Sequence, residues 1–188
     1  MKIKIVGIDP AMANMGLAKA TLDLDTLDIH IDELILPQTE SENGKTVRKN
    51  SDDIRRAKIL YDGMVEACKD ASFAIAEVPV GSQSARAMAS YGICVGVLAA
   101  CPIPLIQVTP TEVKLAAIGE KNASKLEMID WGIKKYPYAN WIMRKKGGVM
   151  VPQNCNEHLA DACAAIEAGL KTQQFKAATA MLRGLKAA

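Results

Sequence analysis

Hydrophobic and polar residues alternate along three stretches near the start of the chain. They run from Lys2 to Ile8, from Gly16 to Leu24 and from Thr26 to Leu36. A period of two residues is typical of β-strands that bury one face. Because the stretches are separated by only a few residues, many of them turn formers, we expect an antiparallel meander of three strands.

The remainder of the chain alternates between helical patterns and short apolar runs. Ser51, Asp52 and Asp53 have the composition of a helix start, and an apolar stripe with helical spacing continues to Cys68. Two buried strands are predicted at 72–78 and 105–108, and polar loops at 37–50 and 137–153. Further helices are predicted at 84–100 and 122–136, and another begins at the capping box formed by Thr109 and Glu112. Two more are predicted toward the C-terminus, one from an Asn156 cap to about Gly169 and one in the alanine-rich stretch that follows.

This order of elements predicts an α/β fold. Buried strands that alternate with helices favour a mixed five-stranded central sheet, in which two parallel strands are added to the three antiparallel ones and helices cover both faces. No repeat, low-complexity segment or linker divides the sequence, so we expect residues 1–188 to form a single domain.

Composition restricts the class of protein only weakly. The 188 residues are 49% hydrophobic and 23% charged, and the net charge is +2, so any nucleic-acid surface must be local. Cys68, Cys94 and Cys163 fall on apolar helix faces, which favours buried free thiols over a zinc site. No leader or membrane-length apolar run is seen, and we expect a cytoplasmic protein.

Four candidate metal ligands occur at the ends of predicted elements. Asp9 lies where the first strand ends, Glu77 follows the apolar run 73–76, and His158 and Asp161 are three residues apart on one helix. Each has a structural alternative when taken alone: an Asx-turn for Asp9, a solvated strand end for Glu77, and a helix cap for His158. Asp161 lies in an otherwise apolar stretch, where an unpaired carboxylate is costly to bury.

Taken together, these residues indicate a site for hard divalent cations. Oxygen-rich sites hold Mg²⁺ or Mn²⁺ in preference to zinc, and two such ions can promote in-line phosphoryl displacement. We therefore predict two Mg²⁺ ions per site, with Mn²⁺ able to substitute. Glu157, which lies beside His158, competes with it for the fourth ligand position.

At this point the chain resembles the RuvC family of Holliday-junction resolvases. The matches occur in the family's order: Gly7-Ile8-Asp9-Pro10 with Gly16, then Ala76-Glu77-Val78, then the segment from Thr109 to Lys125, and finally His158-Leu159-Ala160-Asp161-Ala162. The resemblance implies an RNase H-like fold, metal binding by Asp9, Glu77, His158 and Asp161, and DNA contacts by Lys114 and Lys125. It also implies a homodimer that makes paired nicks in branched DNA, most of all in four-way junctions.

Two features of the resemblance bear on DNA binding and assembly. Relatives carry an aromatic wedge shortly after the second acid, whereas 78–81 contains none, which suggests a divergent, phage-type member. The family's dimer packs through the helix that corresponds to 84–100. Here Gly92 and Gly96 permit close approach either of a second subunit or of the chain's own sheet.

One basic run stands out among several. Arg144, Lys145 and Lys146 precede two glycines just before the helix that carries His158, and we predict that they bind DNA phosphates. Trp141 nearby either stacks on a base or anchors the segment, and anchoring is favoured.

Other functions fit parts of the pattern. The same metal site serves nucleases that cut RNA–DNA hybrids, flaps or forks, because the substrate is chosen by shape. Gly7-Ile8-Asp9 with Gly16 also resembles the phosphate loop of actin-like and sugar-kinase ATPases, although those proteins need two such domains. A junction-binding protein without activity is disfavoured because all four ligand positions are occupied by suitable residues.

Overall fold

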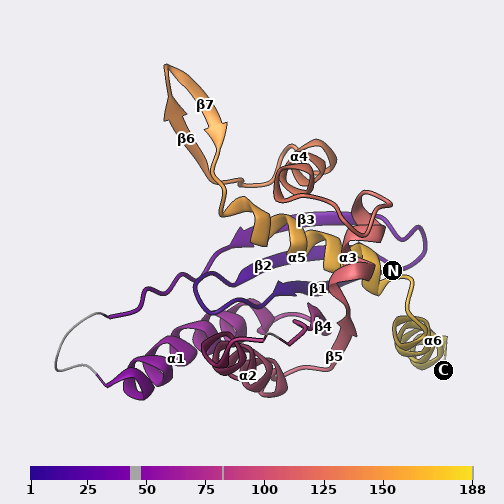
Figure 1. The fold of residues 1–188 in the computed structure, drawn as a ribbon. Coiled ribbons are helices and arrows are strands. Elements are labelled where there is room, and N and C mark those ends of the chain that lie inside the picture. Colours follow the sequence, from indigo (N-terminus) through magenta and orange to yellow (C-terminus); the bar gives the residue numbers. More distant parts are fainter. Residues whose placement is uncertain (43–47, 82, 188) are drawn as a thin grey trace.

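A mixed five-stranded sheet forms the centre of the computed structural model, which describes residues 1–42, 48–81 and 83–187 (Figure 1). The spatial order is β3-β2-β1-β4-β5. The first three strands pair antiparallel, and β4 and β5 are added in parallel beyond β1. The predicted α/β sheet is therefore confirmed. The strands are β1 (Lys2–Asp9), β2 (Gly16–Asp23), β3 (Ile29–Ile35), β4 (Phe73–Glu77) and β5 (Leu105–Val108).

Helices cover both faces of this sheet. Helices α1 (Lys49–Cys68) and α2 (Ala85–Ala99) lie on one face, and α5 (Asn156–Gly169) crosses the other (Figure 1). Two shorter helices, α3 (Pro110–Ala117) and α4 (Lys125–Lys135), pack beside α5, and α6 (Gln173–Ala187) follows it in the chain. Among the described residues, no helix combines the length and apolar character needed to cross a bilayer.

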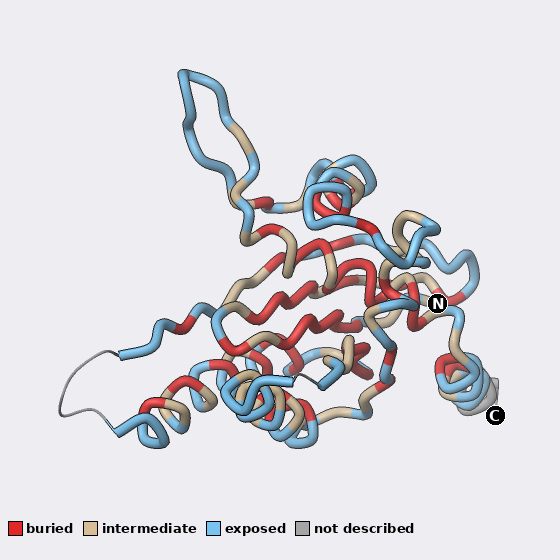
Figure 2. Tube along the Cα trace, viewed as in Figure 1, coloured by how far each residue is buried: buried red, intermediate tan, exposed pale blue. Residues whose placement is uncertain are grey.

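Alternation along the strands divides the core into two layers. On β1 and β4, Ile5, Phe73 and Ile75 contribute to the layer beneath α5. Their neighbours Val6 and Ala74 contribute to the layer beneath α1 and α2. Both layers are almost fully buried along the central strands (Figure 2). Side chains at positions 9 and 77 continue the first series, so they project on the α5 side of the sheet.

Two glycines let α5 approach the sheet at backbone distance. A Cβ atom on Gly7 would overlap the carbonyl oxygen of Ala162, and one on Gly16 would overlap the carbonyl oxygen of His158. Ten of the 14 residues of α5 are buried, among them the run 162–166. Small side chains on the helix and glycines on the strands thus hold α5 directly over the ends of β1 and β2.

The segment 137–153, predicted to be a loop, contains a β-hairpin. Strands β6 (Met143–Lys146) and β7 (Val149–Pro152) pair antiparallel and project away from the body (Figure 1). Gly147 and Gly148 have φ of 58° and 86°, the positive values that a two-residue hairpin turn of type I′ requires at both central positions. The loop prediction was wrong because β6 contains three consecutive cations and lacks the alternating apolar residues by which a half-buried strand is recognised.

Several helix starts differ from those predicted. Helix α1 begins at Lys49 instead of Ser51, and part of the preceding polar loop, 43–47, lies outside the described residues. Helix α4 begins later than predicted, after a capping box formed by Ser124 and Glu127. The capping box of Thr109 is confirmed.

The cysteine prediction is confirmed, whereas one interpretation of the α2 glycines is wrong. Cys68, Cys94 and Cys163 are buried free thiols. Apart from their own stretch of helix, no atom of the described residues lies within 4 Å of the Cβ positions of Gly92 and Gly96, so these glycines do not pack against the subunit's own sheet.

The close approach of α5 can be tested by adding one methyl group. Gly7→Ala should lower the free energy of unfolding by roughly 1–3 kcal/mol, because the new Cβ meets backbone, which cannot rotate away. Gly92→Ala is the matched control, since its Cβ enters open space and removing a helical glycine stabilises by up to about 1 kcal/mol. Urea unfolding at low protein concentration gives both values. Equal stability of Gly7→Ala and wild type would contradict the packing described.

Candidate active site

Asp9 and Glu77 lie side by side at the carboxyl ends of two parallel strands. In the pairing of β1 with β4, Ile8 lies opposite Ala76, and each acid is the next residue along its strand. Both side chains project toward α5. The sequence pattern of an acid after an apolar strand therefore places two carboxylates at one edge of the sheet, as predicted.

Helix α5 brings His158 and Asp161 over the same edge. His158 Nδ1 lies 2.6 Å from Asp9 Oδ2, so the two side chains form a hydrogen-bonded pair across 149 residues of sequence. Asp161 is one turn further along the helix and on the same face. The charges of Asp9 and Glu77 raise the pKa of Asp161, and the charge of Asp9 raises the pKa of Glu77, so the three carboxylates form one electrostatic cluster.

Burial makes the negative charge of this cluster costly. Desolvation, followed by the charge of Asp9, raises the pKa of Glu77 to about 8. Desolvation, followed by the charges of Asp9 and Glu77, likewise raises the pKa of Asp161 to about 8. Burial also raises the pKa of Asp9, although the His158 hydrogen bond opposes this shift. Like charges in a shared low-dielectric space are the physical cause.

His158 partly compensates that charge. Burial acts against the imidazolium form, but the hydrogen bond and the charge of Asp9 outweigh it, so the pKa of His158 is raised. A protonated His158 places a positive charge 2.6 Å from Asp9 Oδ2. The pair therefore stabilises the cluster in the absence of a cation.

One atom of the cluster has no hydrogen-bond partner. Among the buried side-chain nitrogen and oxygen atoms of the described residues, Asp161 Oδ1 alone is unsatisfied. An orphaned buried carboxylate oxygen costs free energy unless a proton or a cation satisfies it. The donor set of three carboxylates and an imidazole fits a hard divalent ion. Within the described part of the chain, however, no group of three or more such side chains has the arrangement of a complete metal site.

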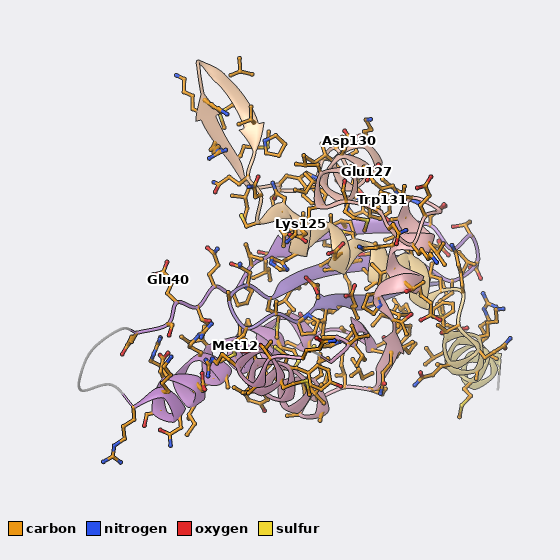
Figure 3. All side chains as sticks on the ribbon, viewed as in Figure 1. Met12, Glu40, Lys125, Glu127, Asp130 and Trp131 are labelled. Carbon is orange, nitrogen blue, oxygen red and sulfur yellow. The ribbon has the colours of Figure 1, made fainter. Side chains whose placement is uncertain are left out.

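The two lysines that the resemblance implies as DNA contacts, Lys114 and Lys125, interact with different acids of the site. Lys125 is labelled in Figure 3, at the start of α4. Its Nζ is 2.8 Å from Glu157 Oε2, so its charge is paired with the first turn of α5. Lys114 on α3 acts on Glu77 and opposes the rise in its pKa. Glu157, the alternative fourth ligand, is thus held by an ion pair, whereas His158 is held by Asp9.

The hairpin cations Arg144, Lys145 and Lys146 are brought near the same end of α5. All three are exposed, and within the part of the chain that the structure describes none of them forms an ion pair. Trp141 is buried and donates its Nε1 hydrogen to the carbonyl oxygen of Tyr136, so the predicted anchoring role is confirmed.

Sequence reasoning missed the function of Asn156. It was expected to cap α5, but Cys155 occupies that position. The fully buried Asn156 side chain accepts a hydrogen bond from the Ile142 amide and donates one to its carbonyl, at 2.9 and 2.8 Å. It thereby fixes the base of the hairpin. The available signal was Gly147-Gly148 followed by Val-Met-Val, which is typical of a hairpin turn and strand.

Comparison with known proteins gives the same fold. No family model matches the chain. T. thermophilus RuvC in complex with Holliday junction substrate superposes with a TM-score of 0.62 and 17% identity, over 88% of this chain and 92% of that one. A second structure of Thermus thermophilus RuvC gives a TM-score of 0.59 and 17% identity, over 89% of this chain and 92% of that one. Ydc2, the yeast mitochondrial Holliday junction resolvase, gives 0.51 and 14%, over 89% and 81%.

At these identities the similarity establishes the architecture. The chain has the RNase H-like fold of RuvC, and the resemblance predicted from the sequence motifs is confirmed at the level of the fold.

The cost of the buried cluster predicts how stability depends on pH. Asp161 has a folded pKa of about 8 against an ordinary value of 3.8, so the folded state holds a proton that the unfolded state releases. The contribution of Asp161 to the stability of the metal-free protein should therefore be fully present below about pH 4 and be lost as pH rises toward 8.

Asp161→Asn removes the charge that causes this loss. At pH 8 the variant should melt a few degrees above metal-free wild type, since about 1 kcal/mol corresponds to 2–4 °C in a chain of this size. Below about pH 4, where Asp161 is protonated in both the folded and the unfolded state, the two should melt together. Added Mn²⁺ should raise the melting temperature of wild type more than that of the variant. Scanning calorimetry with and without EDTA measures all three effects, and a variant less stable than wild type at pH 8 would contradict the assignment.

Proposed function

We propose that the protein is a structure-selective endonuclease that cleaves branched DNA, with four-way junctions as its preferred substrate. The observation that carries this proposal is the buried cluster of Asp9, Glu77 and Asp161. Ionising all three carboxylates costs free energy unless cations bind, because burial and the neighbouring negative charges oppose it. The shared fold supports the proposal, because one protein of that fold is described in complex with Holliday junction substrate.

We assign metal binding to Asp9, Glu77, Asp161 and His158. The three carboxylates supply the negative charge that two adjacent dications require, and the free oxygen of Asp161 is available for one of them. When bound, Mg²⁺, or Mn²⁺ in its place, activates the attacking water and stabilises the leaving oxygen. His158 is preferred over Glu157 as the fourth ligand because its imidazole contacts the carboxylate of Asp9 directly, whereas Glu157 is paired with Lys125.

Residues around the cluster position the substrate. Lys114 lies close enough to Glu77 to act on its charge, so a phosphate bound between them would be partly neutralised by this lysine. Lys125 becomes available to DNA if Glu157 releases it. Arg144, Lys145 and Lys146 extend the basic surface along the hairpin. In this proposal the acidic residues hold the catalytic metal ions and the basic residues bind the DNA.

A homodimer would cover an exposed apolar surface on the α1 and α2 side of the molecule. An apolar groove between α1 and α2 is lined by Ala57, Tyr61, Ile93, Gly96 and Val97. Gly92 and Gly96 leave open space above α2. A second copy of the chain packing on this helix would bury the groove and present two active sites to opposite strands of one junction.

Removing single charges from the cluster tests the nuclease assignment. Asp9→Asn and Glu77→Gln should each slow cleavage of a four-way junction at least roughly a hundredfold, about 2.7 kcal/mol in activation free energy. Both should bind the junction within about threefold of wild type, since neither change removes a cation. Asp62→Asn, an exposed acid of α1, is the matched control and should cut normally. Cleavage by Asp9→Asn within tenfold of wild type would exclude Asp9 from the site.

The same assay separates the substrates. Wild type with Mg²⁺, and with Mn²⁺, is offered labelled duplex, flap, fork, four-way junction and RNA–DNA hybrid, and the junction should be cut fastest. Faster cutting of the hybrid, flap or fork would assign the site to the corresponding alternative. On a cruciform plasmid a homodimer should give linear product, whereas independent monomers would accumulate nicked circles.

A further inference from the structure

The β6–β7 hairpin exposes apolar side chains that no part of the described chain covers. Val149 is 64% exposed and Met150 is 55% exposed, directly after the turn. The hairpin projects from the body, and Figure 2 shows it exposed along almost its whole length. A two-stranded ribbon gains little stability of its own in water. Its exposed apolar residues therefore indicate a surface that becomes covered in a complex.

Each face of the hairpin combines cations with apolar side chains. Lys145 lies opposite Met150, and Lys146 lies opposite Val149. Directly opposed residues of an antiparallel pair project to the same side of the ribbon. The hairpin thus presents one cation and one apolar side chain near its tip on either face. This composition matches a polyanion that also offers apolar surface, which is the chemistry of nucleic acid with exposed bases.

The base of the hairpin is fixed relative to the acid cluster. The Asn156 side chain holds both backbone groups of Ile142, and the Gln153 amide donates to the Ile142 carbonyl at 3.0 Å. Asn156 begins the helix that carries His158 and Asp161. Four residues per strand reach roughly 13 Å beyond this anchor. The tip therefore stands at a set distance from the bond that the cluster would cut.

Intact duplex offers little to the apolar tip. Valine and methionine form no hydrogen bonds with base edges, and the faces of stacked bases are covered by their neighbours. Base faces become accessible where stacking is interrupted, as at a branch point, and apolar side chains can enter such a step. Phosphates on either side remain within reach of the hairpin cations.

We propose that the hairpin is the branch-recognition element of the enzyme. Val149 and Met150 enter the branch point and pack against unstacked bases, while Arg144, Lys145 and Lys146 bind the flanking phosphates. The inference rests on the proposed function, because it takes branched DNA as the substrate. It adds which residues discriminate a branch from a duplex.

Polar residues of the same shape provide the test. The double variant Val149→Thr/Met150→Gln keeps strand propensity and side-chain size while removing apolar surface. Met181→Gln, at a methionine of α6 that is 71% exposed, is the matched control. Met150→Leu is the conservative apolar variant. Binding is measured in EDTA with a four-way junction that carries 2-aminopurine at the branch point, and with duplex of the same sequence.

Wild type, Met181→Gln and Met150→Leu should raise the 2-aminopurine fluorescence on binding and prefer the junction. The double variant should lose most of the fluorescence change and lower the preference roughly tenfold, about 1.4 kcal/mol. Its salt dependence should be unchanged. Arg144→Gln/Lys145→Gln/Lys146→Gln should instead flatten the plot of log affinity against log salt by about 0.9 for each phosphate that the hairpin no longer binds.

Three results would overturn the inference. The first is a double variant that retains both the fluorescence change and the junction preference. The second is an equal loss of affinity for junction and duplex, which would indicate groove binding. The third is loss of the signal in Val80→Thr alone, because Val80 is 73% exposed in the segment after Glu77 and is the rival wedge. In each of these cases the proposed function still stands if the wild-type protein cuts branched DNA. If the wild-type protein neither binds nor cuts branched DNA, both the proposed function and the role of the hairpin are excluded.

Discussion

Helix α5 lies on the sheet at backbone contact, and the geometry of the acid cluster depends on that approach. Gly7 and Gly16 leave room for the carbonyl oxygens of Ala162 and His158, so the helix crosses directly above the ends of the strands. At this distance the charges of the carboxylates that end β1 and β4 act on Asp161. A thicker helix–sheet layer would separate these charges and let water in between them. The same contact anchors the hairpin, because Asn156 begins α5 and holds Ile142.

Close packing and charge repulsion are opposed in this molecule. Burial raises the pKa of Glu77 and of Asp161 to about 8, and one oxygen of Asp161 has no hydrogen-bond partner. The pair of His158 with Asp9 offsets part of the cost. A fold selected for stability alone would place neutral side chains here, as it does along 162–166 of α5. Local destabilisation of this kind is common where a site awaits a ligand.

The sequence carries much of this arrangement, but unevenly. Strand alternation and the order of elements predict the sheet, and acids that follow apolar runs predict its functional edge. The hairpin could not be recognised from hydrophobic pattern, because a ribbon exposed on both faces has no buried side to mark its period. The ion pair of Lys125 with Glu157 depends on how α4 packs against α5, and the hydrogen bonds of Asn156 depend on how the hairpin meets α5. Residue spacing within one element does not predict such contacts between elements. Gly7 and Gly16 were recognised as a motif, and their steric reason emerges only when α5 is in place.

We propose that the buried carboxylates form a cation site that holds protons until a metal replaces them. Calorimetric titration with Mn²⁺ at pH 7, repeated in buffers of different ionisation enthalpy, measures that exchange directly. Groups with a pKa of about 8 are largely protonated at this pH, so binding should release about one proton or more per chain. Asp161→Asn should release fewer. Absence of binding, or binding whose heat does not depend on the buffer, would contradict the account.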